Sequence, residues 1–150
     1  MAEEERPKQE NEATAEKQKE IQQKYVEYQV AEQQIKQLQQ QMERLEAQTA
    51  EASAIEQSIA DISKAKPGEE VLVPVSGGVF FKATMDDNHK FLVNVGGGVV
   101  VEKDVDGTKD LLKKQSDEID KYKEQIAQQL AEHFTKFQQL ELELKKLVED

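Results

Sequence analysis

Two glycine clusters are the first residues in this chain whose type and spacing could do chemistry. Gly77-Gly78 and Gly96-Gly97-Gly98 could in principle cradle a phosphate group through their backbone N–H groups. A phosphate loop of this kind continues into Gly-Lys-Ser/Thr and opens a helix, and neither feature follows either cluster. Each cluster instead separates two runs of β-branched and aromatic residues. We therefore predict that both clusters are hairpin turns.

The side chains that could bind a metal or transfer a proton are poorly placed for either task. His89 lies beside a predicted turn and His133 on a predicted helix, and neither has a second set of ligands. Carboxylates are abundant, but no pair of them stands in an apolar pocket that could separate their pKa values. We expect no metal, no cofactor and no catalytic residue.

The net charge restricts the choice of partners. The 150 residues include 31 acidic and 20 basic side chains, which gives a formal charge of −11. Nucleic acids and anionic membrane surfaces both attract lysine and arginine, so neither is an expected partner. No apolar run approaches the roughly 20 residues of a membrane span. Residues 1–10 are polar and unlike a signal peptide, so we expect a flexible N-terminus and a cytoplasmic protein.

Residues 11–66 are predicted to form a long helix. Their apolar side chains recur at steps of three and four, the 3.5-residue period of a coiled-coil seam. Repeated steps of three near Tyr28 and Ala52 predict local overwinding, and Pro67-Gly68 ends the helix. The predicted seam positions are Ile21, Tyr25, Tyr28, Ala31, Ile35, Leu38, Met42, Leu45, Thr49, Ala52, Ile55, Ile59 and Ile62.

Residues 69–104 change character and read as strands. Residues 73–79 are repeated in pattern by residues 93–99, and each copy is centred on one glycine cluster. Alternating β-branched residues predict two β-hairpins, with a polar link at Asp86-Asp87-Asn88. Both faces of these hairpins carry apolar side chains, and a single layer of strands cannot bury two faces. We therefore expect the strands to pair with strands of other subunits.

Residues 105–150 are predicted to form a second long helix. A second helix of similar length after a compact connector favours a mostly α fold, in which the helices fold back into a long antiparallel two-helix coiled coil with two central β-hairpins. Two consecutive steps of four at Tyr122, Ile126 and Leu130 predict a stutter. The predicted seam positions are Leu112, Gln115, Ile119, Tyr122, Ile126, Leu130, His133, Phe137, Leu140, Leu144 and Leu147.

The N-terminal part of the first predicted helix and the C-terminal part of the second hold more apolar residues than a two-helix seam can bury. These side chains either thicken the core locally or form a surface for the apolar segments of unfolded chains, and the pattern alone leaves both readings open. We name these residues the tip set: Ile21, Tyr25, Val26, Tyr28, Val30, Phe134, Phe137, Leu140, Leu142, Leu144, Leu147 and Val148.

Two stretches of the chain resemble a known family. Val-Leu-Val-Pro-Val-Ser-Gly-Gly-Val-Phe (71–80) and Val-Gly-Gly-Gly-Val-Val-Val-Glu-Lys-Asp (95–104), set between long helices, are similar to the archaeal alpha class of the prefoldin family. The resemblance extends over nearly the whole chain. Two hairpins match the alpha class, because subunits of the beta class carry one.

This resemblance implies a molecular chaperone that is not an enzyme. It implies a hexamer of two alpha and four prefoldin beta subunits, with an intersubunit β-barrel and coiled-coil tentacles. It also implies ATP-independent capture of unfolded client proteins at the tentacle tips, here the tip set, and delivery to a group II chaperonin. The implied barrel positions, which we name the barrel set, are Val73, Val75, Val79, Phe81, Val93, Val95, Val99 and Val101.

Two other classes of protein share this outline. A coiled-coil arm that binds structured RNA would need a basic stripe, whereas acidic residues dominate both helices. A structural filament or scaffold protein of the same family is harder to separate, because open-ended strand pairing gives filaments where closed pairing gives a hexamer.

Overall fold

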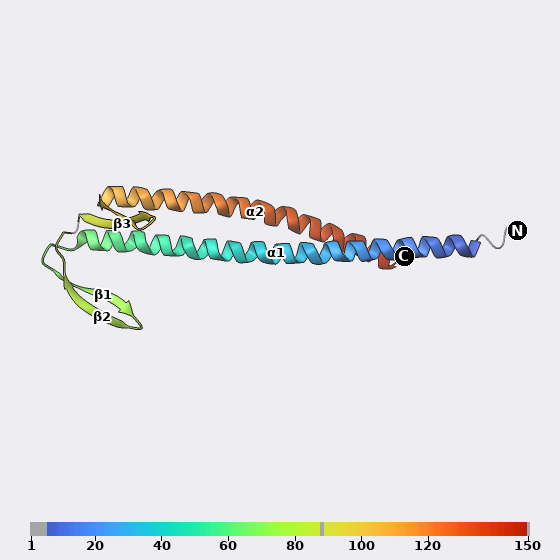
Figure 1. The fold of residues 1–150 in the computed structure, drawn as a ribbon, viewed down its shortest axis with the longest axis horizontal. Coiled ribbons are helices and arrows are strands. Elements are labelled where there is room, and N and C mark those ends of the chain that lie inside the picture. The colour runs from blue at the N-terminus through green and yellow to red at the C-terminus, as the bar shows by residue number, and fades with distance from the viewer. Residues whose placement is uncertain (1–5, 88, 150) are drawn as a thin grey trace. The chain divides into compact units, whose positions relative to one another are not determined.

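The computed structural model of the chain describes residues 6–87 and 89–149, and Figure 1 shows its elements. They follow the predicted order of helix, two hairpins and helix, so the mostly α fold class is confirmed. Residues 6–44 and 122–149 belong to one compact unit, the terminal unit, and residues 45–121 to a second, the central unit. The elements are α1 (Arg6–Lys64), β1 (Glu70–Ser76), β2 (Val79–Thr84), β3 (Lys90–Gly96), β4 (Val99–Asp104) and α2 (Val105–Glu149).

Helix α1 begins earlier and ends earlier than predicted. It starts at Arg6, so residues 6–10 of the expected flexible N-terminus are helical, while residues 1–5 lie outside the described part. The physical reason is composition: Lys, Gln, Glu and Ala are strong helix formers, and Pro7 falls in the first turn, where a backbone N–H has no helical partner. The helix ends at Lys64, two residues before the predicted Lys66, in a tight turn in which the Ala65 N–H donates to the Ile62 carbonyl at 3.1 Å.

The least exposed side chains of α1 mark a seam that is more regular than predicted. Between residues 21 and 52 they alternate without a break between steps of three and four. Lys24 lies on this seam, whereas Tyr25 is 53% exposed, so the overwinding predicted near Tyr28 is wrong. The seam positions are Ile21, Lys24, Tyr28, Ala31, Ile35, Leu38, Met42, Leu45, Thr49 and Ala52.

Helix α2 shows the same regularity. Lys123 rather than Tyr122 lies on its seam, because Tyr122 is 59% exposed, and Ser116 replaces Gln115. The predicted stutter therefore disappears. Two further predicted positions, Ile55 and Ile62 of α1, are also exposed, so they do not belong to the seam. The α2 positions that follow the regular steps are Leu112, Ser116, Ile119, Lys123, Ile126, Leu130, His133, Phe137, Leu140, Leu144 and Leu147.

The two hairpins repeat one design. Each is a separate antiparallel sheet, β1 with β2 and β3 with β4. The register Glu70↔Thr84 recurs as Lys90↔Asp104, and each first strand has one irregularity, at Val75 and at Val95. Each turn consists of two glycines with positive φ, at 57° and 81° in the first hairpin and at 60° and 76° in the second. Such angles fit a type I′ turn, which matches the natural twist of the strands.

The hairpins differ in the sign of one cross-strand ion pair. In the first hairpin Glu70 of β1 forms an ion pair with Lys82 of β2, and the N and O atoms are 3.4 Å apart. In the second hairpin Lys90 of β3 pairs with Glu102 of β4, again at 3.4 Å. The acidic and basic residues have exchanged strands. All four side chains are exposed, so each pair adds little to the stability of its hairpin.

The start of α2 is fixed by a side-chain cap. The Asp104 carboxylate accepts from the Gly107 N–H at 2.7 Å, and the Thr108 hydroxyl donates to the Asp104 carbonyl at 2.7 Å. A Cβ atom at position 107 would stand 2.8 Å from that carboxylate oxygen, so any other residue there would require the carboxylate to shift away from the cap. Asp104 also ends β4, and the cap therefore couples the second hairpin to the helix.

Loss of this cap should weaken the central unit. Asp104→Ala removes the acceptor for a free N–H of the first turn and is expected to lower the free energy of unfolding by about 1 kcal/mol. Asp104→Asn keeps an oxygen acceptor and should retain most of the stability. Urea unfolding followed by far-ultraviolet circular dichroism measures both. Equal stability of the alanine variant and the unaltered chain would contradict the cap.

Candidate functional site

An aromatic stack joins the two helices of the terminal unit. The rings of Tyr28 in α1 and Phe137 in α2 have their centroids 4.5 Å apart and an interplanar angle of 24°. Burial is the main cause that raises the pKa of the Tyr28 hydroxyl, and the nearby carboxylates Glu141 and Glu32 raise it further. Seven residues before Tyr28 in α1, Ile21 shares a pocket with Val148, which comes after Phe137 in α2. The two helices therefore run antiparallel in this unit.

A charged pair connects the seam of α1 to α2, one turn of α1 away from the stack. The Lys24 ammonium donates to the Glu143 carboxylate, and both side chains are partly shielded from solvent. This hydrogen bond is the largest cause that raises the pKa of Lys24, and the carboxylates Glu20 and Glu27 also favour its charged form. An ion pair beside an apolar seam favours the register in which its two charges meet, because a slip of one helix against the other separates them.

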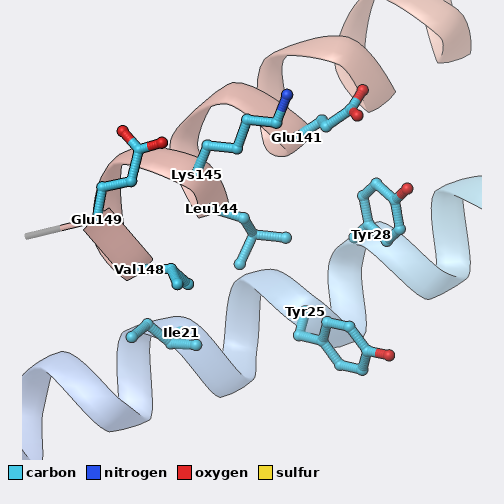
Figure 2. Close-up of a pocket in the computed structure, with 8 residues that line it drawn as sticks. All are labelled: Ile21, Tyr25, Tyr28, Glu141, Leu144, Lys145, Val148 and Glu149. Atoms are coloured by element: carbon cyan, nitrogen blue, oxygen red, sulfur yellow. The ribbon is translucent and has the colours of Figure 1, made fainter.

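A pocket of about 370 Å³ opens in the terminal unit between residues 21–28 of α1 and residues 141–149 of α2. In Figure 2 Ile21 and Tyr28 of α1 face Leu144 and Val148 of α2, while the ring of Tyr25 turns away from α2. The apolar side chains form the walls. Glu141, Lys145 and Glu149, which follow one another at intervals of one turn along α2, form a charged rim. The volume is sufficient for a large apolar side chain.

The tip set divides into three groups in the structure. Six members expose their side chains to solvent: Tyr25, Val26, Val30, Phe134, Leu142 and Val148. Five are half-buried: Ile21, Tyr28, Phe137, Leu144 and Leu147. Leu140 is only 5% exposed, so we correct its assignment. It occupies the seam and cannot contact a client without unpacking the helices.

Leu140 and Leu142 form a matched pair for testing this division. Leu140→Ala is expected to lower the free energy of unfolding by about 3 kcal/mol, because it removes a buried side chain and leaves a cavity. Leu142→Ala should leave it nearly unchanged, because Leu142 is 61% exposed. Urea unfolding monitored by circular dichroism compares the two. Similar losses in both variants would contradict the burial assigned to Leu140.

The sequence did not single out the charged members of this site. A pattern based on residue type selects Tyr25, whereas a strict alternation of threes and fours selects Lys24. The spacing to apolar residues could identify Glu141 and Glu149. Glu141 lies about one turn before Leu144 on the same helix, and Glu149 directly follows Val148. Glu143 carried no signal of its own, because its role depends on the facing helix.

The barrel set is available for contacts in the central unit. Val75, Val79, Phe81, Val95, Val99 and Val101 are exposed, and Val73 and Val93 are half-buried. The opposite faces of the hairpins also expose apolar side chains, namely Leu72, Phe80, Leu92 and Val100. Each sheet has only two strands, so both faces and both edges remain without a strand partner among the described residues.

The described residues contain no cluster of three or more His, Cys, Asp or Glu side chains placed to hold a metal ion. Within the same residues, none of the helices is long and apolar enough to cross a membrane.

Comparison with known proteins places this architecture in a family. The family model described as prefoldin subunit matches residues 31–150, which is most of the chain. The chain therefore belongs to the prefoldin subunit family, and the predicted resemblance to its archaeal alpha class is confirmed.

Individual relatives agree with the family assignment. The chain is 37% identical over 70 residues to a protein of Thermofilum pendens named prefoldin subunit alpha. This match covers 47% of this chain and 54% of the relative. It is 36% identical over 98 residues to prefoldin subunit alpha 1 of Methanocaldococcus jannaschii, and this match covers 63% of this chain and 68% of the relative. For the Thermofilum protein and its counterpart in Methanopyrus kandleri, the match spans only about half of the relative's length.

A solved structure has the same fold. A chain from the cryo-EM structure of filamentous PFD from Methanocaldococcus jannaschii superimposes with a TM-score of 0.69. The comparison covers 77% of this chain and 95% of that chain, at 21% sequence identity. At this identity the likeness shows the shared fold alone.

Proposed function

We propose that this chain is a subunit of an ATP-independent chaperone that captures unfolded proteins through its tip set. Membership of the prefoldin subunit family supports the general role. The observation that supports the site most directly is the exposure of six apolar side chains in the terminal unit, two of which, Tyr25 and Val148, line an open pocket. Exposed apolar surface of this kind binds the apolar segments that an unfolded chain cannot bury.

The barrel set is proposed as the assembly surface. Two-stranded sheets are marginally stable in water, and these have exposed edges and two apolar faces. Pairing with strands of other subunits would bury both. The partners we propose are prefoldin beta subunits, in a hexamer of two alpha and four beta chains located in the cytoplasm. A group II chaperonin would then receive the captured client. In this role the chain has no catalytic residue and no cofactor.

An aggregation assay on assembled protein tests the capture of clients. The chain is co-expressed with a beta-class partner, and the composition of the complex is read by native mass spectrometry. A chemically unfolded protein is then diluted into buffer with and without the complex, in the absence of ATP, and light scattering is followed. Suppressed scattering is expected. Undiminished scattering in the presence of an intact complex would refute the proposal.

A filament is the second candidate. It is favoured by the shared fold with a chain of filamentous PFD and by the free strand edges of both hairpins. Electron microscopy of the purified chain, alone and with a beta-class partner, distinguishes the two. Open fibres formed by the chain alone would favour the filament, and closed particles formed only with the partner would favour the hexamer.

A further inference from the structure

The pocket of the terminal unit combines apolar walls with an unbalanced set of charges. Ile21, Leu144 and Val148 provide apolar contact, and Tyr25 and Tyr28 add aromatic rings. Six carboxylates lie at this pocket or act electrostatically on Lys24 and Tyr28, which flank and line it: Glu20, Glu27, Glu32, Glu141, Glu143 and Glu149. Among the residues that the structure describes, the ammonium groups at this site are those of Lys145, which lines the pocket, and Lys24, which is already paired with Glu143.

The remaining cation does not balance the rim. Lys145 lines the pocket between Glu141 and Glu149, one turn from each along α2, and it can offset one of the two. Lys146 does not line the pocket. A net negative potential therefore surrounds an apolar opening. Its effect reaches the pocket wall, since Glu141 and Glu32 both favour the protonated form of the Tyr28 hydroxyl.

We propose that this pocket binds a large apolar side chain of an unfolded protein together with a lysine or arginine beside it in the same chain. The inference rests on the proposed capture of unfolded proteins and specifies which of their segments the terminal unit selects. The apolar side chain would enter between Ile21 and Leu144. The neighbouring cation would lie at the rim, near Glu141 or Glu149.

The geometry suits such a pair of side chains. A volume of about 370 Å³ exceeds the need of one side chain, so it can also cover the aliphatic stem of a lysine or arginine whose charged head stays in water. The exposed ring of Tyr25 offers a face on which a guanidinium or ammonium group can lie. An acidic residue in the same place would meet the carboxylates Glu141 and Glu149 at the rim, so segments with acidic flanks are disfavoured.

Three labelled peptides test this inference on the full chain in its assembled state. Each is an unstructured Gly/Ser-rich peptide with one Phe-Leu pair, flanked by lysine, serine or glutamate. Binding is measured by fluorescence anisotropy. At low salt the lysine peptide is expected to bind about ten-fold more tightly than the glutamate peptide, as two exposed charge contacts allow. At about 0.5 M salt the ratio should fall to about two, because exposed charges are screened.

A pair of double variants assigns the effect to the rim. Glu141→Gln with Glu149→Gln should reduce the low-salt ratio from about ten-fold to about three-fold. Glu118→Gln with Glu124→Gln removes the same number of charges from exposed positions of α2 outside the pocket and should leave the ratio unchanged. A ratio that falls equally in both double variants would assign the preference to net charge and overturn the inference.

The outcomes separate this inference from the proposed function. Equal binding of all three peptides would overturn the selection of basic flanks while leaving the capture of unfolded chains intact. Binding of none of the peptides by an intact assembly would overturn both.

Discussion

A variant that lacks residues 1–27 and 138–150 is expected to lose its suppression of client aggregation while it keeps its assembly. The truncation removes the pocket, the Lys24–Glu143 pair and most of the exposed members of the tip set. It leaves the hairpins untouched, since they belong to the central unit. In the proposed assembly, several weak contacts on several subunits would supply the affinity together, so removing one set from every copy of the chain should have a large effect. Light scattering of an unfolded client measures it.

Point variants refine this test without shortening the helices. Tyr25→Ser with Val148→Ser removes two exposed side chains at the pocket and should weaken client binding by about ten-fold. Tyr122→Ser is the matched control, because Tyr122 is as exposed as Tyr25 and lies outside the tip set. Full protection by the truncated chain, or equal losses in the control and the double variant, would exclude the tip set as the client surface.

The double substitution Val75→Asp with Val95→Asp is expected to abolish assembly. Both side chains are exposed in the single chain, at 62% and 48%, and both lie at the irregular position of their hairpin. The single chain should therefore fold as before. In a strand interface, each carboxylate would lose its water without gaining a cation, and burial of an unpaired charge is strongly unfavourable. Native mass spectrometry should detect separate subunits.

A helix substitution controls for the added charge. Ile55→Asp introduces the same carboxylate at an exposed position of α1 outside the hairpins and should leave the assembly intact. An intact complex formed by the chain with both hairpin substitutions would disprove the role of the barrel set.

The elements were predictable because their signals are local. The glycine pairs predict turns, since two consecutive positive φ values are available to glycine at little cost. The second copy of the hairpin pattern after the first made the four strands and their pairing evident. Helix α1 was predicted in kind but not in extent, because a polar run of good helix formers contains no seam from which its start can be read.

The seam was less predictable because hydrophobicity and position conflict there. Tyr25 and Tyr122 are more apolar than their neighbours Lys24 and Lys123, so a pattern based on residue type selected the tyrosines. In the structure position decides: an unbroken heptad places the lysines on the seam and the tyrosines outside it. A long aliphatic stem lets lysine cover apolar surface while its charge reaches a partner, as Lys24 reaches Glu143.

The candidate site was predictable in its apolar part only. Exposed surplus residues follow from counting what a two-helix seam can bury, and six of the tip set are indeed exposed. The pocket and its rim depend on which residue of α2 faces which residue of α1. That pairing is set by the Tyr28–Phe137 stack and by the ion pair, and neither is visible in one helix alone.

The opposite placement of acidic and basic residues in the two hairpins could determine which neighbouring subunit binds to which hairpin in an assembly. Turn, irregularity and register are the same in both hairpins, so a strand that fits one of them by shape also fits the other. The ion pair is one point at which the hairpins differ: β1 presents Glu70 where β3 presents Lys90. A neighbour placed on the wrong hairpin would bring like charges together, which is penalised. If the hairpins pair with strands of other subunits as proposed, one duplicated shape carries two different charge patterns, and these would distinguish two neighbours.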